Sequence, residues 1–256
     1  MSMATERAWE LVLARIESDL LNGTLKIGDH LPPERTLAAE LDVGRSSVRE
    51  AVRVLEVLGL VRIGTGSGPT AGAVVVSRPG GGMSALMRLQ VAGRGFAVDD
   101  VVRTRVLLES SVAAELASAV QDLTDAHSLL EVMDRASPPE EFLALDAQFH
   151  YLLAEMSGNT VVAAVMAGLR GSIEGYVVDG ARGFADWPAV ASRLQGEHRG
   201  LLAAIEAGDA AGASALVAEH IRSYYRDSNL SVGSLDQSSA RSRADVSRSH
   251  PNQHQR

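Results

Sequence analysis

The sequence contains no cysteine, and this absence excludes disulfides, thiolate metal sites and cysteine nucleophiles. Aromatic residues are also scarce, at 4% of the 256 positions. No apolar run approaches the roughly 18 residues that a membrane-spanning helix needs. The first residues, MSMATERAW, lack the basic and apolar regions of a signal peptide. We therefore expect a soluble, cytoplasmic protein that does not enter a membrane.

The charge of the chain is acidic overall but positive in one segment. The net charge of −8 argues against a generally basic surface for nucleic acid. Between residues 43 and 62, however, four arginines stand against two glutamates, which gives 4 − 2 = +2. A local positive patch on an acidic protein suits sequence-specific DNA binding, because the rest of the surface limits non-specific retention.

Residues 31–66 predict two helices separated by a tight turn. The first helix is expected at residues 33–41 and the second, after a break at residues 42–44, at residues 45–58. Apolar residues of the second helix recur at the spacing of a buried face; they are Val48, Val52, Leu55 and Leu58.

A second side of this helix carries Arg45, Arg49 and Arg53 at intervals of four residues. At about 100° per residue, this spacing keeps three guanidinium groups along one outward edge. Such a helix can enter the major groove of DNA, where arginine binds guanine or phosphate with its planar set of donors. The alternative is a solvated face with ion pairs to Glu50 and Glu56, which we favour less for three arginines in this pattern.

The flanking segments complete a winged helix. An amphipathic helix is expected at residues 5–21, and strands at residues 60–63 and 73–76 are separated by a glycine-rich turn at residues 64–69. Three helices followed by a hairpin predict a winged helix-turn-helix.

Residues 31–66 follow the motif LPPER-x-LA-x-x-L-x-V-x-R-x-x-VREA-x-R-x-LE-x-x-GLV-x-x-x-x-G. This motif closely resembles the DNA-binding domain of GntR-type bacterial transcription regulators. The resemblance covers about Trp9 to Val76. Two positions depart from the family pattern: Gly44 and Pro33 stand where the family usually has serine. Glycine is only slightly weaker than serine at a helix N-cap, and proline fits the first turn of a helix.

The resemblance implies a DNA-binding role for named positions. Arg35, Arg45 and Arg49 would face DNA, and the wing glycine Gly66 would approach the minor groove. On the same recognition helix we also expect DNA contacts from Ser46, Ser47 and Arg53.

The remainder of the chain predicts an antiparallel helical bundle, so the fold class is mainly α. We expect a DNA-binding domain at residues 1–78, a glycine-rich linker at 79–82, an effector-binding and dimerisation domain at 83–227, and a disordered, serine- and arginine-rich tail at 228–256. The helices of the bundle are expected at residues 83–93, 98–119, 123–136, 138–156, 160–181, 187–206 and 209–227.

Four polar residues fall on apolar faces of these helices. Asp146 and His150 lie one turn apart on one helix, and His198 and His220 lie among aliphatic residues of two later helices. Burying each of these groups alone would be costly, whereas convergence on one divalent cation (Zn²⁺, Ni²⁺, Co²⁺, Mn²⁺ or Fe²⁺) would remove that cost. The alternative is that each histidine is a hydrogen-bonded core residue, and the sequence does not show that the four converge.

The same segment resembles the FCD effector domain of the FadR subfamily, over about residues 83–227. The resemblance implies that Asp146 and the three histidines hold a metal at the floor of a ligand cavity. The matching motifs are Arg105-x-x-x-Glu109, Asp146-x-x-x-His150, Ser157-Gly158-Asn159, Glu197-His198 and Glu219-His220.

Arg105 lies in an otherwise apolar helix and is our candidate for binding a ligand carboxylate through two parallel hydrogen bonds. A structural pair with Glu109 is an equally good interpretation.

We therefore expect a ligand-responsive transcription regulator, not an enzyme. It would be a homodimer that binds a palindromic operator, most often as a repressor in this subfamily, and it would respond to a small organic acid. The alternative function is a metal-dependent hydrolase of small carboxylate or lactone substrates, for which the sequence offers no recognisable general base.

Overall fold

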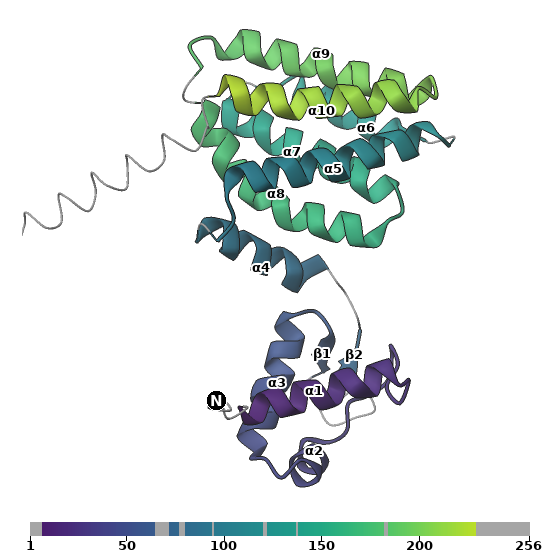
Figure 1. The fold of residues 1–256 in the computed structure, drawn as a ribbon, viewed down its shortest axis with the longest axis vertical. Coiled ribbons are helices and arrows are strands. Elements are labelled where there is room, and N and C mark those ends of the chain that lie inside the picture. The colour runs from purple at the N-terminus through teal and green to yellow at the C-terminus, as the bar shows by residue number, and fades with distance from the viewer. Residues whose placement is uncertain are drawn as a thin grey trace, which may run out of the picture. The chain divides into compact units, whose positions relative to one another are not determined.

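The computed structural model describes residues 7–64, 72–76, 80–93, 95–119, 122–136, 138–181 and 184–228. The chain divides into two compact units, Met1–Leu86 and Met87–Arg256. Figure 1 shows mainly helices, with one small hairpin in the first unit. The predicted fold class is confirmed. The expected tail, from residue 229 onwards, and the wing residue Gly66 lie outside the described residues.

The first unit is a three-helix domain with a hairpin. Its elements are α1 (Ala8–Leu21), α2 (Glu34–Glu40), α3 (Arg45–Val57), β1 (Val61–Gly64) and β2 (Gly72–Val75). Its core forms as the apolar spacing predicts, and the buried members are Val12, Ile16, Leu25, Leu31, Leu37, Ala38, Val48, Ala51, Val52, Leu55, Val61 and Val75. Leu58 differs from the expected stripe because α3 ends before it, and it is 39% exposed.

The turn between α2 and α3 depends on two residues that follow α2. Asp42 has a φ of 52°, in the left-handed region that aspartate tolerates better than most residues. Gly44 is the N-cap of α3 in an extended conformation. Since glycine has no side chain to cap the helix, α3 begins without a side-chain cap hydrogen bond.

The hairpin is extended by the loop that precedes α2. Strands β1 and β2 are antiparallel, with Val61 opposite Val75. The Leu31 N–H donates to the Ala73 carbonyl (2.8 Å), and the Val75 N–H donates to the Asp29 carbonyl (2.9 Å). The hairpin is therefore fixed to the helical core on its β2 side.

The glycines that we expected to form a linker are helical instead. Gly80, Gly81 and Gly82 form the first turn of α4 (Gly80–Ala92). A Cβ on Gly82 would lie 2.4 Å from the Leu58 Cα and 2.6 Å from the Val57 carbonyl oxygen. Gly82 is thus needed for the close approach of two backbones rather than for flexibility.

The second unit is a bundle around α5 (Val98–Ala117). This helix packs along α10 (Ala210–Asp227) and also contacts α7 (Pro139–Met156) and α9 (Trp187–Glu206) (Figure 1). The remaining helices of the bundle are α6 (Thr124–Met133) and α8 (Thr160–Ala181), both of which pack on α7.

Local sequence signals fix where several of these helices start and stop. The Asp186 and Asp209 carboxylates accept backbone N–H groups at the starts of α9 and α10, as N-cap residues do. Gly158 and Gly208 take φ values of 73° and 72° just beyond the ends of α7 and α9. In the part of the chain that the structure describes, no helix has both the length and the apolar character needed to cross a membrane.

The contact at Gly82 predicts a difference between neighbouring glycine variants. Gly82→Ala should destabilise the first unit by about 1–3 kcal/mol, because its Cβ meets backbone that cannot move aside. Gly81→Ala is the matched control, since its Cβ meets nothing within 4 Å, and it should change stability by less than about 1 kcal/mol. Urea unfolding followed by Trp9 fluorescence in a Trp187→Phe background measures both, and equal stabilities of the two variants would contradict the contact.

Candidate metal centre and recognition helix

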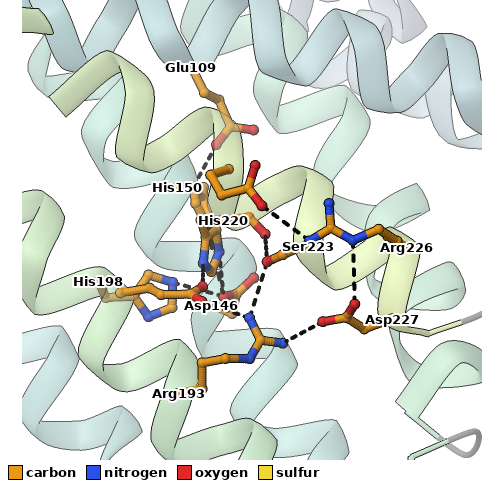
Figure 2. A network of polar contacts seen from close by, with 11 residues as sticks. Glu109, Asp146, His150, Arg193, His198, His220, Ser223, Arg226 and Asp227 are labelled. Carbon is orange, nitrogen blue, oxygen red and sulfur yellow. Dashed lines mark hydrogen bonds and ion pairs between the residues drawn. The ribbon is translucent and has the colours of Figure 1, made fainter. Parts of the chain in front are cut away.

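Four side chains that could hold a metal ion converge inside the bundle from three helices. Asp146 and His150 lie one turn apart on α7, His198 lies in the middle of α9, and His220 lies on α10. They are 6%, 2%, 1% and 7% exposed, respectively. One ligand atom from each lies within 4.8 Å of all the others. The structure thus brings together the four residues whose convergence the sequence left open (Figure 2).

The distances suit a single small cation. The Nε2 atoms of His150 and His220 are 3.1 Å apart, and His198 Nε2 is 3.0 Å from Asp146 Oδ1. The same Oδ1 is 3.8 Å from His150 Nε2 and 3.7 Å from His220 Nε2. Two ligand atoms that each lie about 2.1 Å from a shared ion are about 3.0 Å apart at a right angle and about 3.4 Å apart at the tetrahedral angle.

Unsatisfied polar atoms support the same interpretation. Asp146 Oδ1 and His198 Nε2 are buried and have no aligned hydrogen-bond partner, although they are in contact. Leaving a buried polar atom unpaired costs about 1–3 kcal/mol. A cation at the point where these atoms meet would satisfy both, and three imidazoles with one carboxylate form a donor set that Zn²⁺ and neighbouring transition metals accept.

The charged neighbours of the cluster shift its titration. Burial raises the pKa of Asp146, but the imidazoles of His198 and His220 outweigh burial and hold it well below its usual value. Burial and the charge of His220 lower the pKa of His198 to about 4. Burial also lowers the pKa of His220, but contacts with Asp146 and Glu197 outweigh it and raise that pKa to about 9.

Two glutamates lie on the outer side of the cluster. Glu109 Oε2, on α5, is 2.6 Å from His150 Nδ1, and Glu197 Oε2, on α9, is 2.8 Å from His220 Nδ1. Glu197 was not among the predicted site residues, because its partner His220 lies on another helix, α10. Its spacing of four from Arg193, with which it forms an ion pair, is a sequence signal that marks it.

Arg105 forms the structural pair that was the alternative to a ligand clamp. It is 3% exposed, and its Nε donates to Glu109 Oε1 at 2.7 Å. Burial raises the pKa of Glu109, but the charges of Arg105 and His150 outweigh burial and lower it to about 2. Binding of an effector carboxylate by Arg105 stays a prediction.

In the first unit, α3 presents its arginines to solvent. Arg35, Arg45, Ser46, Arg49 and Arg53 are exposed and Ser47 is half-buried. Arg49 Nε donates to Glu34 Oε2 at 2.8 Å. Among the described residues no ion pair involves Arg45 or Arg53. The pairs to Glu50 and Glu56 that we considered are not formed there, and Glu56 instead accepts the Ile63 N–H at 3.2 Å.

Two family models match the chain. Residues 10–70 match the model described as bacterial regulatory proteins, gntR family, and residues 100–223 match the FCD domain.

Curated relatives and one solved structure agree with these matches. The Exu regulon transcriptional regulator of Escherichia coli (strain K12) is 31% identical over 162 residues, which cover 62% of this chain and 60% of that protein. The HTH-type transcriptional repressor NanR of Citrobacter rodentium is 30% identical, with 65% of each chain covered. The chain thus matches about three fifths of the length of these relatives. A Streptococcus agalactiae GntR structure has a TM-score of 0.57 at 27% identity, covering 85% of this chain and 99% of that one.

Metal binding to this cluster should be coupled to proton release. A metal requires neutral imidazoles, and in the metal-free protein the pKa of His220 is raised to about 9, so that this group is protonated at neutral pH. We expect the apparent metal affinity to rise with pH up to about 9, by roughly tenfold per unit for one displaced proton. Calorimetry in buffers of different ionisation enthalpy measures the protons released, and an affinity that is constant between pH 6 and 8 would contradict the expectation.

Proposed function

Since the chain belongs to the GntR family of bacterial regulatory proteins and carries an FCD domain, we propose that it is a ligand-responsive transcription regulator. In this proposal the first unit binds operator DNA, and the bundle binds a divalent metal together with a small organic acid. The observation that carries the proposal is the buried convergence of Asp146, His150, His198 and His220 in a chain that also presents an arginine-lined helix.

The proposed DNA contact runs through α3. Its arginines are exposed, and a recognition helix enters the major groove with its N-terminal residues near the base edges. Arg45 and Ser46 stand at that end, while Arg49 and Arg53 follow along the same edge. Two copies of the chain, related by a two-fold axis, would bind a palindromic operator, and repression is the role we propose for it.

Charge balance supports an anionic effector. Glu109 is paired with Arg105 and Glu197 with Arg193, so that Asp146 is the carboxylate of the cluster with no guanidinium partner among the described residues. A divalent cation held by one uncompensated carboxylate and neutral imidazoles keeps a net charge of +1. Such a centre attracts a carboxylate to an open coordination position.

Effector binding would act on the DNA-binding units through a coupling free energy. Typical allosteric coupling of about 1–3 kcal/mol changes affinity roughly 5- to 150-fold, and the same factor applies to effector binding when DNA is bound.

A hydrolase is the weaker alternative. The matched domains and the named relatives are those of transcription regulators, not of enzymes. The nearest extra carboxylates, on Glu109 and Glu197, are occupied by imidazole and guanidinium groups and are not free to act as a general base.

The metal centre is tested by removing two of its ligands. The variant His150→Ala with His198→Ala should lose its bound metal, because two donors remain, and should lose the response to carboxylic acids while it still binds DNA. The control is His127→Ala, since His127 is exposed and paired with Glu206. Elemental analysis of the purified proteins decides the outcome: an unchanged metal content in the double variant would refute the ligand assignment.

The recognition helix is tested by substitution of its arginines. Arg45→Ala and Arg49→Ala should each weaken binding to the cognate operator by about 1–3 kcal/mol, and together they should abolish specific binding. Arg103→Ala is the matched control, because Arg103 is an exposed arginine of α5 that pairs with Asp100. Electrophoretic mobility shifts at fixed salt measure the effect, and the DNA-binding assignment fails if the double variant binds the operator as tightly as the control.

A further inference from the structure

Two of the three imidazoles in the cluster have a glutamate on their outer nitrogen. We infer that Glu109 and Glu197 are positioning residues of the proposed metal centre, which hold His150 and His220 in the tautomer and orientation that direct Nε2 to the metal. This inference rests on the proposed function, because it concerns the same centre. It assigns a role to two residues outside the ligand set.

Glu109 contacts His150 from α5, a helix that contributes no ligand. Its carboxylate is 4% exposed, and its Oε2 lies 2.6 Å from His150 Nδ1, although the two atoms are not aligned for a hydrogen bond. Its other oxygen, Oε1, accepts a hydrogen bond from Arg105 Nε at 2.7 Å. Because the Arg105 guanidinium holds one oxygen and the other oxygen lies against the imidazole, Glu109 is fixed on the side of His150 that faces away from the cluster.

Glu197, on α9, lies in the corresponding position against His220, on α10, and this pair is a hydrogen bond. Its Oε2 lies 2.8 Å from His220 Nδ1, and its Oε1 accepts from Arg193 Nη1 at 2.6 Å. Arg193 also donates to Ser223 Oγ at 3.1 Å and to Asp227 Oδ2 at 3.3 Å. Figure 2 shows this network around Arg193 and the C-terminal part of α10.

The chemistry of imidazole gives these contacts their meaning. A neutral histidine has one N–H and one lone pair, and an acceptor at Nδ1 fixes the proton there and leaves the lone pair on Nε2. In both residues Nε2 is the atom that faces the cluster, since the two Nε2 atoms are 3.1 Å apart. A carboxylate on the outer nitrogen also raises the basicity of the ligand.

His198 is held in a different way. Among the described residues no carboxylate pairs with its Nδ1, which is buried without a hydrogen-bond partner, and its ring centroid lies 4.8 Å from that of Phe149. Packing, rather than an acceptor, therefore orients this ring. The outer support of the centre is limited to His150 and His220 in the described structure, so loss of either glutamate should affect one identifiable ligand.

The experiment measures Zn²⁺ affinity of the full chain by competition with a chromophoric chelator. Glu109→Gln and Glu197→Gln should each bind Zn²⁺ about 10- to 100-fold more weakly than the wild type. The matched control is Glu219→Gln. Glu219 directly precedes His220, but its side chain is 63% exposed and pairs with Arg226, so this variant should bind Zn²⁺ as the wild type does.

A second readout separates positioning from a general loss of stability. In ¹⁵N-edited spectra of the zinc-loaded protein, the Nδ1–H resonance of His220 should shift in Glu197→Gln and that of His150 should not. Glu197→Asp should recover part of the affinity. If Glu109→Gln fails to fold, the Glu197 variants still test the proposal. The Glu197 side chain is 28% exposed, and substitution of Glu197 leaves no fully buried guanidinium unpaired.

The outcomes distinguish the two proposals. A wild-type chain that binds no Zn²⁺, Ni²⁺, Co²⁺, Mn²⁺ or Fe²⁺ would overturn the proposed metal centre. A wild-type chain that binds Zn²⁺, with Glu197→Gln binding as tightly as Glu219→Gln, would leave the centre standing and overturn the positioning role.

Discussion

The bundle buries a carboxylate and three imidazoles side by side, and this burial constrains the rest of the domain. Asp146 and His198 have buried atoms in contact that are not aligned for a hydrogen bond, an arrangement that costs free energy unless another group satisfies them. The helices α7, α9 and α10 all supply side chains to this point that could hold a metal ion. A cation there would link three helices that are separate in sequence, and its binding free energy would contribute to the folding of the domain.

Acidic and basic groups surround the cluster of Asp146 and the three histidines in alternate layers. Around the ligands lie the carboxylates of Glu109 and Glu197, and behind these lie the guanidinium groups of Arg105 and Arg193. Each carboxylate thus pairs with a guanidinium group on one side and lies within 2.8 Å of an imidazole nitrogen on the other, and buried ions are retained in a protein interior when they are paired in this way. The same order explains an arginine that is 3% exposed in the middle of a largely apolar helix: Arg105 keeps Glu109 ionised, and Glu109 faces His150.

The helices and the shared face of Asp146 and His150 could be predicted from local spacing in the sequence. The features that could not be predicted depend on contacts between segments that are distant in the sequence. A spacing of four on one helix placed Asp146 and His150 on one face. The helices expected at residues 187–206 and 209–227 begin within one residue of α9 and α10, which Asp186 and Asp209 cap. No local pattern states that α9 and α10 bring His198 and His220 to the same place. Glu197 was missed for that reason, since its partner lies on another helix. Gly82 was predicted to lie in a linker because glycine-rich segments are often flexible. The sequence does not show that the backbone of another segment approaches this residue closely.

The arginines of α3 also differ in a way that only the fold reveals. Arg49 is held by Glu34 of α2 at 2.8 Å, in a pair whose side chains are 61% and 43% exposed, whereas Arg45 stands free at the start of the helix among the described residues. An exposed pair of this kind contributes at most about 1 kcal/mol, so a phosphate or a guanine edge can replace the carboxylate at little cost.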